Sequence, residues 1–234
     1  MRFVSFSSAL AICFCLLGSG CSKGITRATA ATVFYVKGNV VFGSAERNNF
    51  EPVTPKSQIH TGDTVRTPDG GSINLALTPG VFVRLSGNSE IKIENLVLTK
   101  DGNETAGGVL DRRASIRLNR ERIVSLFSHS DRSASEFIVT TGQVTLRPDT
   151  DCLFSVWTDG TTSRVTCGRG EVNADADARP QTKIAMGYFF QWPASKNPMV
   201  AITDAAAQMD VKTALDAELE LLDQAAGWQN RKLF

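Results

Sequence analysis

Histidine is scarce in this sequence, and the motifs on which most catalytic and metal sites depend are missing. The 234 residues include only two histidines, His60 and His129, and both lie in polar stretches that predict turns. A catalytic triad or a zinc centre requires several such side chains to converge. We therefore expect no catalytic residue, no metal and no cofactor. An enzyme with an unrecognised site remains an alternative.

An excess of either charge is also missing. Lys and Arg number 25, Asp and Glu number 24, and the formal net charge is +1. Nucleic-acid binding draws much of its affinity from basic residues that neutralise phosphates. The balance of charge therefore argues against a nucleic-acid partner.

Long apolar runs are absent except at the N-terminus. There Arg2 precedes a mostly apolar stretch at residues 3–17. This stretch is too short for a permanent membrane span and has the organisation of a secretory signal. We predict that residues 1–20 are a signal peptide, and a short uncleaved anchor is the alternative.

The end of this signal resembles the lipobox of bacterial lipoproteins, in which small residues precede a cysteine that is diacylated. The matching residues are Leu17, Gly18, Ser19, Gly20 and Cys21. The resemblance implies lipidation of Cys21, and Ser22 implies sorting to the outer membrane. We therefore expect a lipoprotein of the bacterial cell envelope that faces the periplasm. Cleavage by an ordinary signal peptidase, which leaves Cys21 as a free thiol, is the alternative.

Of the five cysteines, Cys13 and Cys15 leave with the signal peptide, and Cys21 is the lipid site. One pair then remains in an oxidising compartment, where disulfides persist. If Asp159-Gly160 is a two-residue turn, Cys152 lies directly opposite Cys167. We predict a disulfide between them, with two reduced core cysteines as the alternative.

The mature chain predicts a mainly β fold: one twisted all-β domain of many short antiparallel strands and hairpins, followed by one C-terminal α-helix. Residues 21–32 are small and polar and predict a lipidated tether. Residues 33–193 alternate apolar and polar positions between turn residues. The expected strands are residues 33–36, 39–42, 64–66, 72–77, 81–85, 90–93, 114–118, 122–127, 137–140, 143–147, 152–158, 162–167, 171–174 and 182–185.

Residues 203–227 predict the C-terminal helix. Thr203 or Asp204 can cap its start, and Gly227 is expected to end it. Its apolar side is expected to consist of Met209, Ala214, Leu215, Leu219 and Leu222. We expect this side to pack on the β domain, and docking of a partner protein is the alternative.

The β region resembles the FecR-domain family over residues 33–187. The motifs that carry the resemblance are Gly62-Asp63-Thr64, Arg84-Leu85, Asn88-Ser89-Glu90, the strand from Phe137 to Thr141, Phe154-Ser155-Val156 and Gly170-Glu171-Val172. The resemblance implies an extracytoplasmic, twisted all-β domain that mediates protein contacts. The family's sigma-factor regulators carry a cytoplasmic segment and a membrane span. This sequence shows neither, so we do not expect that output.

Two clusters could form binding surfaces. Tyr188, Phe189, Phe190 and Trp192 make the densest aromatic run, which we expect to close the end of the β core. The alternative is a patch that stacks on sugars or docks a protein. Arginines gather between residues 112 and 122 and predict a solvated face, with a basic patch as the alternative.

These patterns favour a non-enzymatic, lipid-anchored FecR-domain protein of the cell envelope. Its expected role is protein–protein interaction in envelope assembly or signalling, with the membrane bound through lipid on Cys21. A module that binds carbohydrate or peptidoglycan through the aromatic run is the first alternative.

Overall fold

The computed structural model describes residues 24–100, 109–129, 134–176 and 181–231. The predicted signal peptide and Cys21 lie outside the described residues.

Seventeen strands dominate the described part of the chain, followed by one 3-10 helix and one α-helix. The strands are β1 (Ile25–Ala28), β2 (Ala31–Lys37), β3 (Val41–Ser44), β4 (Asn49–Pro52), β5 (Gln58–Ile59), β6 (Thr64–Arg66), β7 (Ser72–Thr78), β8 (Val81–Lys100), β9 (Val109–Phe127), β10 (Ala134–Thr140), β11 (Val144–Arg147), β12 (Cys152–Thr158), β13 (Ser163–Arg169), β14 (Glu171–Ala176), β15 (Thr182–Ala185), β16 (Tyr188–Trp192) and β17 (Met199–Val200). The helices are η1 (Ala201–Thr203) and α1 (Ala205–Arg231).

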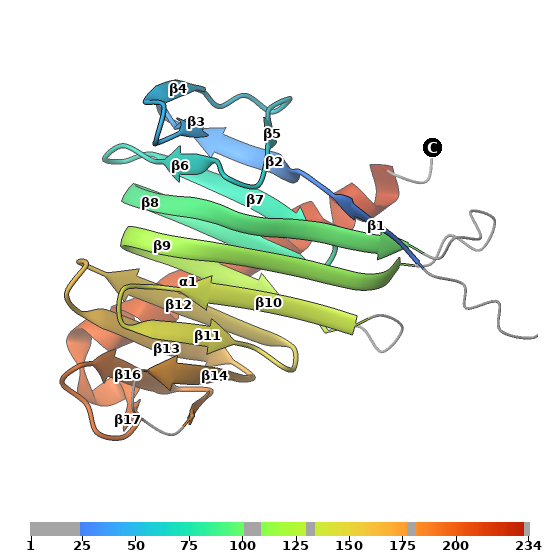
Figure 1. Cartoon of the computed structure of the whole chain (residues 1–234). Helices are drawn as coiled ribbons and strands as arrows, with labels where there is room; N and C mark the ends of the chain where they lie inside the picture. The colour runs from blue at the N-terminus through green and yellow to red at the C-terminus, as the bar shows by residue number, and fades with distance from the viewer. Residues whose placement is uncertain (1–23, 101–108, 130–133, 177–180, 232–234) are drawn as a thin grey trace, which may run out of the picture.

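The strands form one continuous sheet that folds over on itself into two layers (Figure 1). In the helix-side layer, β2 and β7 lie on one side of the β8–β9 pair, and β12, β13, β16 and β17 lie on the other. In the second layer, β4, β3 and β6 lie on one side of that pair, and β10, β11, β14 and β15 lie on the other. The long strands β8 and β9 therefore run through both layers.

The turn from one layer to the other lies within β8 and β9 rather than between strands. In β8, Gly87 and Asn88 have positive φ values of 36° and 56°, a conformation that glycine and asparagine adopt most readily. Ser89 follows and is buried, and its Oγ donates to the backbone oxygen of Arg122 at 2.8 Å. The Asn88-Ser89-Glu90 motif thus fixes the corner by tying β8 to β9.

Apolar side chains of both layers meet in one core. Phe137 of β10 lies between Phe127 of β9 and Phe154 of β12, with ring centroids 6.3 Å apart in each pair. All three rings are buried. Because β10 belongs to the second layer and β12 to the helix-side layer, these rings join the two layers across the core.

Helix α1 lies alone on the outer face of the helix-side layer, and its last turns lie at the same end of the molecule as β1 (Figure 1). Asp204 caps the start, because its Oδ1 accepts the amide of Ala207 at 2.8 Å. The helix continues through Gly227 to Arg231, past its expected end. No helix within the described residues is long and apolar enough to cross a membrane.

The mainly β fold class with one C-terminal helix is confirmed, and three details of the expectation are wrong. The strands expected at 81–85 and 90–93 are one strand, as are those expected at 114–118 and 122–127. The β9–β10 pair is parallel rather than antiparallel. Residues 25–28 of the expected tether form β1, which pairs with the end of β8.

Candidate docking surfaces

Helix α1 sits on the sheet through small side chains. Ala207, Ala214, Ala217 and Leu221 are buried on its sheet-facing side. A Cβ added to Gly168 of β13 would lie 3.6 Å from the Cβ of Ala214, so helix and sheet approach closely there. The sheet side of the main contact consists of Ala76, Phe82, Val124, Leu126 and Leu153.

The apolar side predicted for α1 is therefore wrong for its larger members. Met209, Leu215, Leu219 and Leu222 are all exposed, and of the predicted set only Ala214 is buried. The close approach of the helix to the sheet leaves room for alanines, so the larger side chains face away from it.

A buried ion cluster fixes the first half of α1. Asp210 is 1% exposed, and its Oδ2 accepts a hydrogen bond from Nε of Arg164 at 2.6 Å. Its Oδ1 forms an ion pair with Nη2 of Arg122, also at 2.6 Å. The Arg164 guanidinium also lies 5.1 Å from the centroid of the Trp157 ring. A carboxylate this deeply buried requires such partners, so Asp210 can occupy only this position on the sheet.

Polar pairs fix the second half of α1 to strands on both sides of the β8–β9 pair. Nη1 of Arg169 lies 2.5 Å from Oε1 of Glu218, and Nδ2 of Asn74 donates to Oε1 of Gln224 at 3.0 Å. Arg84 of β8 forms an ion pair with Glu220. The helix therefore spans the helix-side layer from β13 to β7.

The aromatic run does not form the possible interaction patch. Phe189, Phe190 and Trp192 are buried, and Tyr188 is 40% exposed. Phe190 and Trp192 pack against each other in the core with centroids 4.0 Å apart, whereas Phe189 faces Ala201 and Ala207 under the start of α1. The run is strand β16, and its alternation sends these rings to both faces of the sheet.

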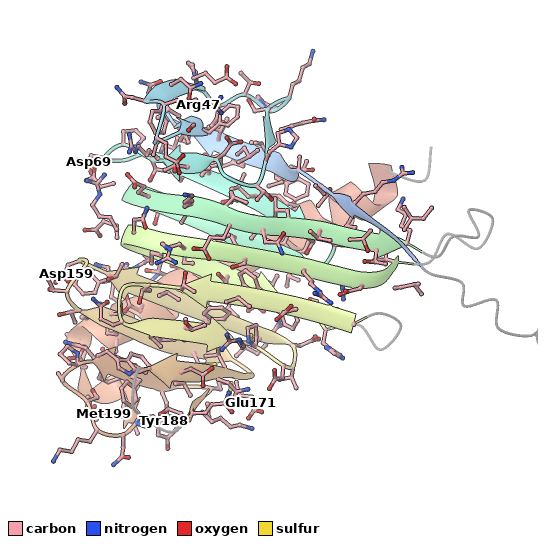
Figure 2. The ribbon with its side chains drawn as sticks, in the orientation of Figure 1. Arg47, Asp69, Asp159, Glu171, Tyr188 and Met199 are labelled. Carbon is pink, nitrogen blue, oxygen red and sulfur yellow. The ribbon has the colours of Figure 1, made fainter. Side chains whose placement is uncertain are left out.

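A different set of exposed apolar side chains gathers at this edge. We call it the hairpin-edge patch: Met186, Tyr188, Met199, Val200 and Ile202. Tyr188 lies opposite Val200 in the β16–β17 ladder, and the Ala201 amide donates to the Gly187 oxygen at 2.8 Å. Figure 2 shows Tyr188 and Met199 projecting at the lower edge of the molecule.

Each arginine of the β9 cluster has a partner of its own within the domain, so the cluster does not form a free basic patch. Arg112 is buried and donates to the Ser128 oxygen at 3.2 Å and to Ser135 Oγ at 2.7 Å. Burial lowers its pKa, and the charge of Asp151 opposes that change. The remaining members pair as follows: Arg113 with Asp111 at 2.9 Å, Arg117 with Glu94 at 2.7 Å, Arg120 with the Asn88 oxygen at 2.9 Å and Arg122 with Asp210 at 2.6 Å.

Cys152 and Cys167 are both free and buried in the structure, so the predicted disulfide is not formed in it. The predicted register is also wrong, because Phe154 rather than Cys152 lies opposite Cys167. The loop between β12 and β13 has four residues, 159–162, instead of two. The pairing of these strands also shifts register between Leu153 and Phe154. Burial raises the pKa of the Cys167 thiol to about 11 and moves the pKa of Cys152 still further above its ordinary range.

The two histidines remain apart from any chemical cluster. His60 and His129 are exposed, and their backbone amides donate to the carboxylates of Asp63 and Asp151, at 2.8 Å and 2.6 Å. No group of three or more His, Cys, Asp or Glu residues within the described ranges could hold a metal ion. That the chain is not an enzyme stays a prediction.

Comparison with known proteins gives one family and two related structures. Residues 63–173 match the family described as FecR protein. Two crystal structures of a candidate anti-sigma factor from Parabacteroides distasonis are similar, at 13% and 12% identity and TM-scores of 0.43 and 0.42. Each match covers 60% of this chain and 62% of the solved chain. A search of curated proteins finds no match. Residues 63–173, just under half of the chain, are therefore similar to this family.

Proposed function

We propose that this chain is a lipid-anchored regulatory or signalling protein of the bacterial envelope, and that it works by binding another protein. Two features support this role: the similarity of residues 63–173 to the FecR family and the lipobox-like sequence that ends at Cys21. The anchor would be acyl chains on Cys21, in the outer membrane on its periplasmic side. The chain would act by contact and not by catalysis.

The hairpin-edge patch carries the proposal. Five large apolar side chains are exposed within residues 186–202, which comprise the turn before β16, the β16–β17 hairpin and the helical turn that follows it. Exposed apolar side chains gathered in this way mark interaction sites on protein surfaces. The patch also lies away from β1, where the described chain enters the domain, so an anchor at Cys21 would leave it accessible (Figure 1).

The patch suits an extended apolar segment of a second envelope protein. β17 pairs with β16, and its other edge has no strand partner among the described residues. The Val200 oxygen accepts Thr203 Oγ1 at 2.7 Å, so it is not available to an added strand. An apolar segment would instead bind this edge mainly by packing its side chains on Tyr188, Val200 and Ile202.

The glycan alternative loses the observation on which it rested. A sugar-stacking site needs exposed aromatic faces, and three of the four rings in the run are buried. Tyr188 alone is available.

The chain's two tyrosines offer a matched test, because Tyr188 and Tyr35 are each 40% exposed and each lies on a strand. A photo-crosslinking amino acid is placed at one position or the other in the lipoprotein as expressed in cells. We expect a discrete protein adduct from position 188 that Ile202→Asp abolishes, and no such adduct from position 35. The same adducts from both positions, or none from 188, would overturn the proposal.

The anchor is tested separately by mass spectrometry of the mature N-terminus. The proposal predicts a diacylglyceryl group on Cys21 and recovery with the outer membrane. An unmodified Cys21 would contradict the anchor without bearing on the hairpin-edge patch.

A further inference from the structure

The outer side of α1 carries a second exposed apolar surface. Leu215, Leu219 and Leu222 follow a spacing of four and three residues, which aligns them along one face of a helix. All three are exposed, whereas Ala214, Ala217 and Leu221 take the sheet-facing side. We call these three leucines the α1 stripe. Nothing within the described residues covers it.

The charges of α1 divide into two groups. Asp210, Glu218 and Glu220 pair with arginines of the sheet. Lys212, Asp216 and Asp223 remain on the outer side, where Lys212 pairs with Asp216 one turn later. Asp223 has no ion-pair partner within the described part of the chain. The α1 stripe is therefore bordered by a lysine near one end and an acidic residue near the other.

This arrangement is self-complementary when two copies of the helix run antiparallel. If Leu215 of one copy packs against Leu219 of the second, two-fold symmetry packs Leu219 of the first against Leu215 of the second. Lys212 lies three residues before Leu215, and Asp223 lies four residues after Leu219. Because the two helices run in opposite directions, a step toward the N-terminus of one is parallel in space to a step toward the C-terminus of the other. Lys212 of each copy therefore reaches Asp223 of the other.

We propose that α1 docks antiparallel against α1 of a second copy of this chain, through the α1 stripe and two Lys212–Asp223 ion pairs. The site is distinct from the hairpin-edge patch and does not depend on the proposed function. A contact between two helices of this length is small, so we expect association at micromolar concentration in solution. Confinement of both copies to one membrane surface would strengthen it.

Charge reversal tests the register of the proposed pair. In sedimentation velocity on the purified protein, Lys212→Glu and Asp223→Lys should each weaken the dimer about tenfold. The double variant Lys212→Glu/Asp223→Lys should recover most of that loss, because both ion pairs are rebuilt with exchanged signs. A protein that is monomeric at all concentrations, or a double variant no better than the single ones, would overturn the proposal.

The stripe itself has a matched control, because Leu219 and Ile202 are each 74% exposed. Leu219→Ala should also weaken the dimer about tenfold, and Ile202→Ala should leave it unchanged. An equal effect of the two substitutions would place the contact elsewhere. In a mixture of Leu215→Cys and Leu219→Cys proteins, oxidation should give a covalent heterodimer, and its absence under conditions where the dimer is present would exclude the antiparallel register.

Discussion

The two faces of the helix-side layer are built from different chemistry. The inner face, with Leu75, Val83, Ile123 and Phe154, is apolar and buried against the second layer. On the outer face, Arg84, Arg122 and Arg164 stand between the apolar positions and bind carboxylates of α1. The same strands therefore hold the second layer by apolar area, and they hold α1 by a smaller apolar contact together with directed ion pairs.

This difference separates stability from placement. Apolar burial supplies most of the driving force of folding and tolerates small shifts between neighbours. A buried ion pair adds little net energy, because removing its charges from water offsets their attraction. It does forbid other arrangements, since a shifted α1 would leave Asp210 or Arg164 buried and unpaired. We therefore expect the core to set the stability of the domain and the ion pairs to set the position of α1.

The largest loss should come from the core between the layers. Phe154→Ala removes a fully buried ring that packs 6.3 Å from Phe137. We expect it to lower the free energy of unfolding by about 3–5 kcal/mol, measured by urea denaturation. Phe154→Leu, which keeps most of the volume, should cost much less. A loss below about 1 kcal/mol for the alanine variant would mean that the two layers do not share this core.

The next effect should come from the ion cluster under α1. Asp210→Asn keeps the shape of the side chain and leaves the two arginines without a counter-charge, so we expect a loss of about 3 kcal/mol. Hydrogen exchange should accelerate in α1 more than in β12. Asp216→Asn, at an exposed ion pair of the same helix, should change stability by less than about 0.5 kcal/mol. Equal effects of the two substitutions would mean that the buried Asp210 cluster holds α1 no more firmly than an exposed ion pair does.

Substitutions at two leucines of α1 compare its sheet-facing side with its outer side. Leu221 is fully buried against the sheet, whereas Leu219 is exposed. Leu221→Ala should lower the free energy of unfolding by about 2–3 kcal/mol, and Leu219→Ala should lower it by less than about 0.5 kcal/mol. Thermal unfolding followed at low protein concentration avoids any contribution from association. The reverse order would mean that the helix faces the sheet with its other side.

The last effect, which vanishes at neutral pH, concerns the titration of the two core thiols. Burial raises the pKa of Cys167 to about 11 and that of Cys152 further, so the folded state keeps protons that the unfolded state releases. The contribution of these thiols to the free energy of unfolding is fully present below the unfolded pKa of about 8.5. Above that pH it decreases by about 1.4 kcal/mol per pH unit for each thiol. The double variant Cys152→Ala/Cys167→Ala should lose this slope. A disulfide would abolish it too, and alkylation of the unfolded, unreduced protein would then label neither cysteine.

Much of the β domain could be predicted because alternation reports which face of a strand is buried. The strands at 64–66, 152–158 and 182–185 have the bounds that alternation predicts. The long strands could not be predicted, because Gly87 and Asn88 have the composition of a turn. In the structure they make a corner that keeps the chain in the sheet and changes its layer. Composition does not distinguish a corner from a reversal.

The surfaces were harder to predict than the strands. Hydrophobicity alone assigns leucines to the buried side of α1, but the close approach to Gly168 selects alanines. The buried Asp210 gives no signal in the sequence, because its partners lie more than 40 positions away.

The aromatic run was expected to close the end of the β core, and Phe189, Phe190 and Trp192 are buried. Alternation within β16 would also have predicted that these rings divide between two faces of the sheet. The sequence signal for the hairpin-edge patch was the pair Met186 and Tyr188, two large apolar residues on either side of a turn glycine.

The central claim is that the hairpin-edge patch binds a protein partner. The most direct test is the dissociation constant between this protein and the partner captured at position 188, compared for Ile202→Asp and Tyr35→Asp. We expect at least about tenfold weaker binding for Ile202→Asp and unchanged binding for Tyr35→Asp. Equal affinities for the two variants would contradict it.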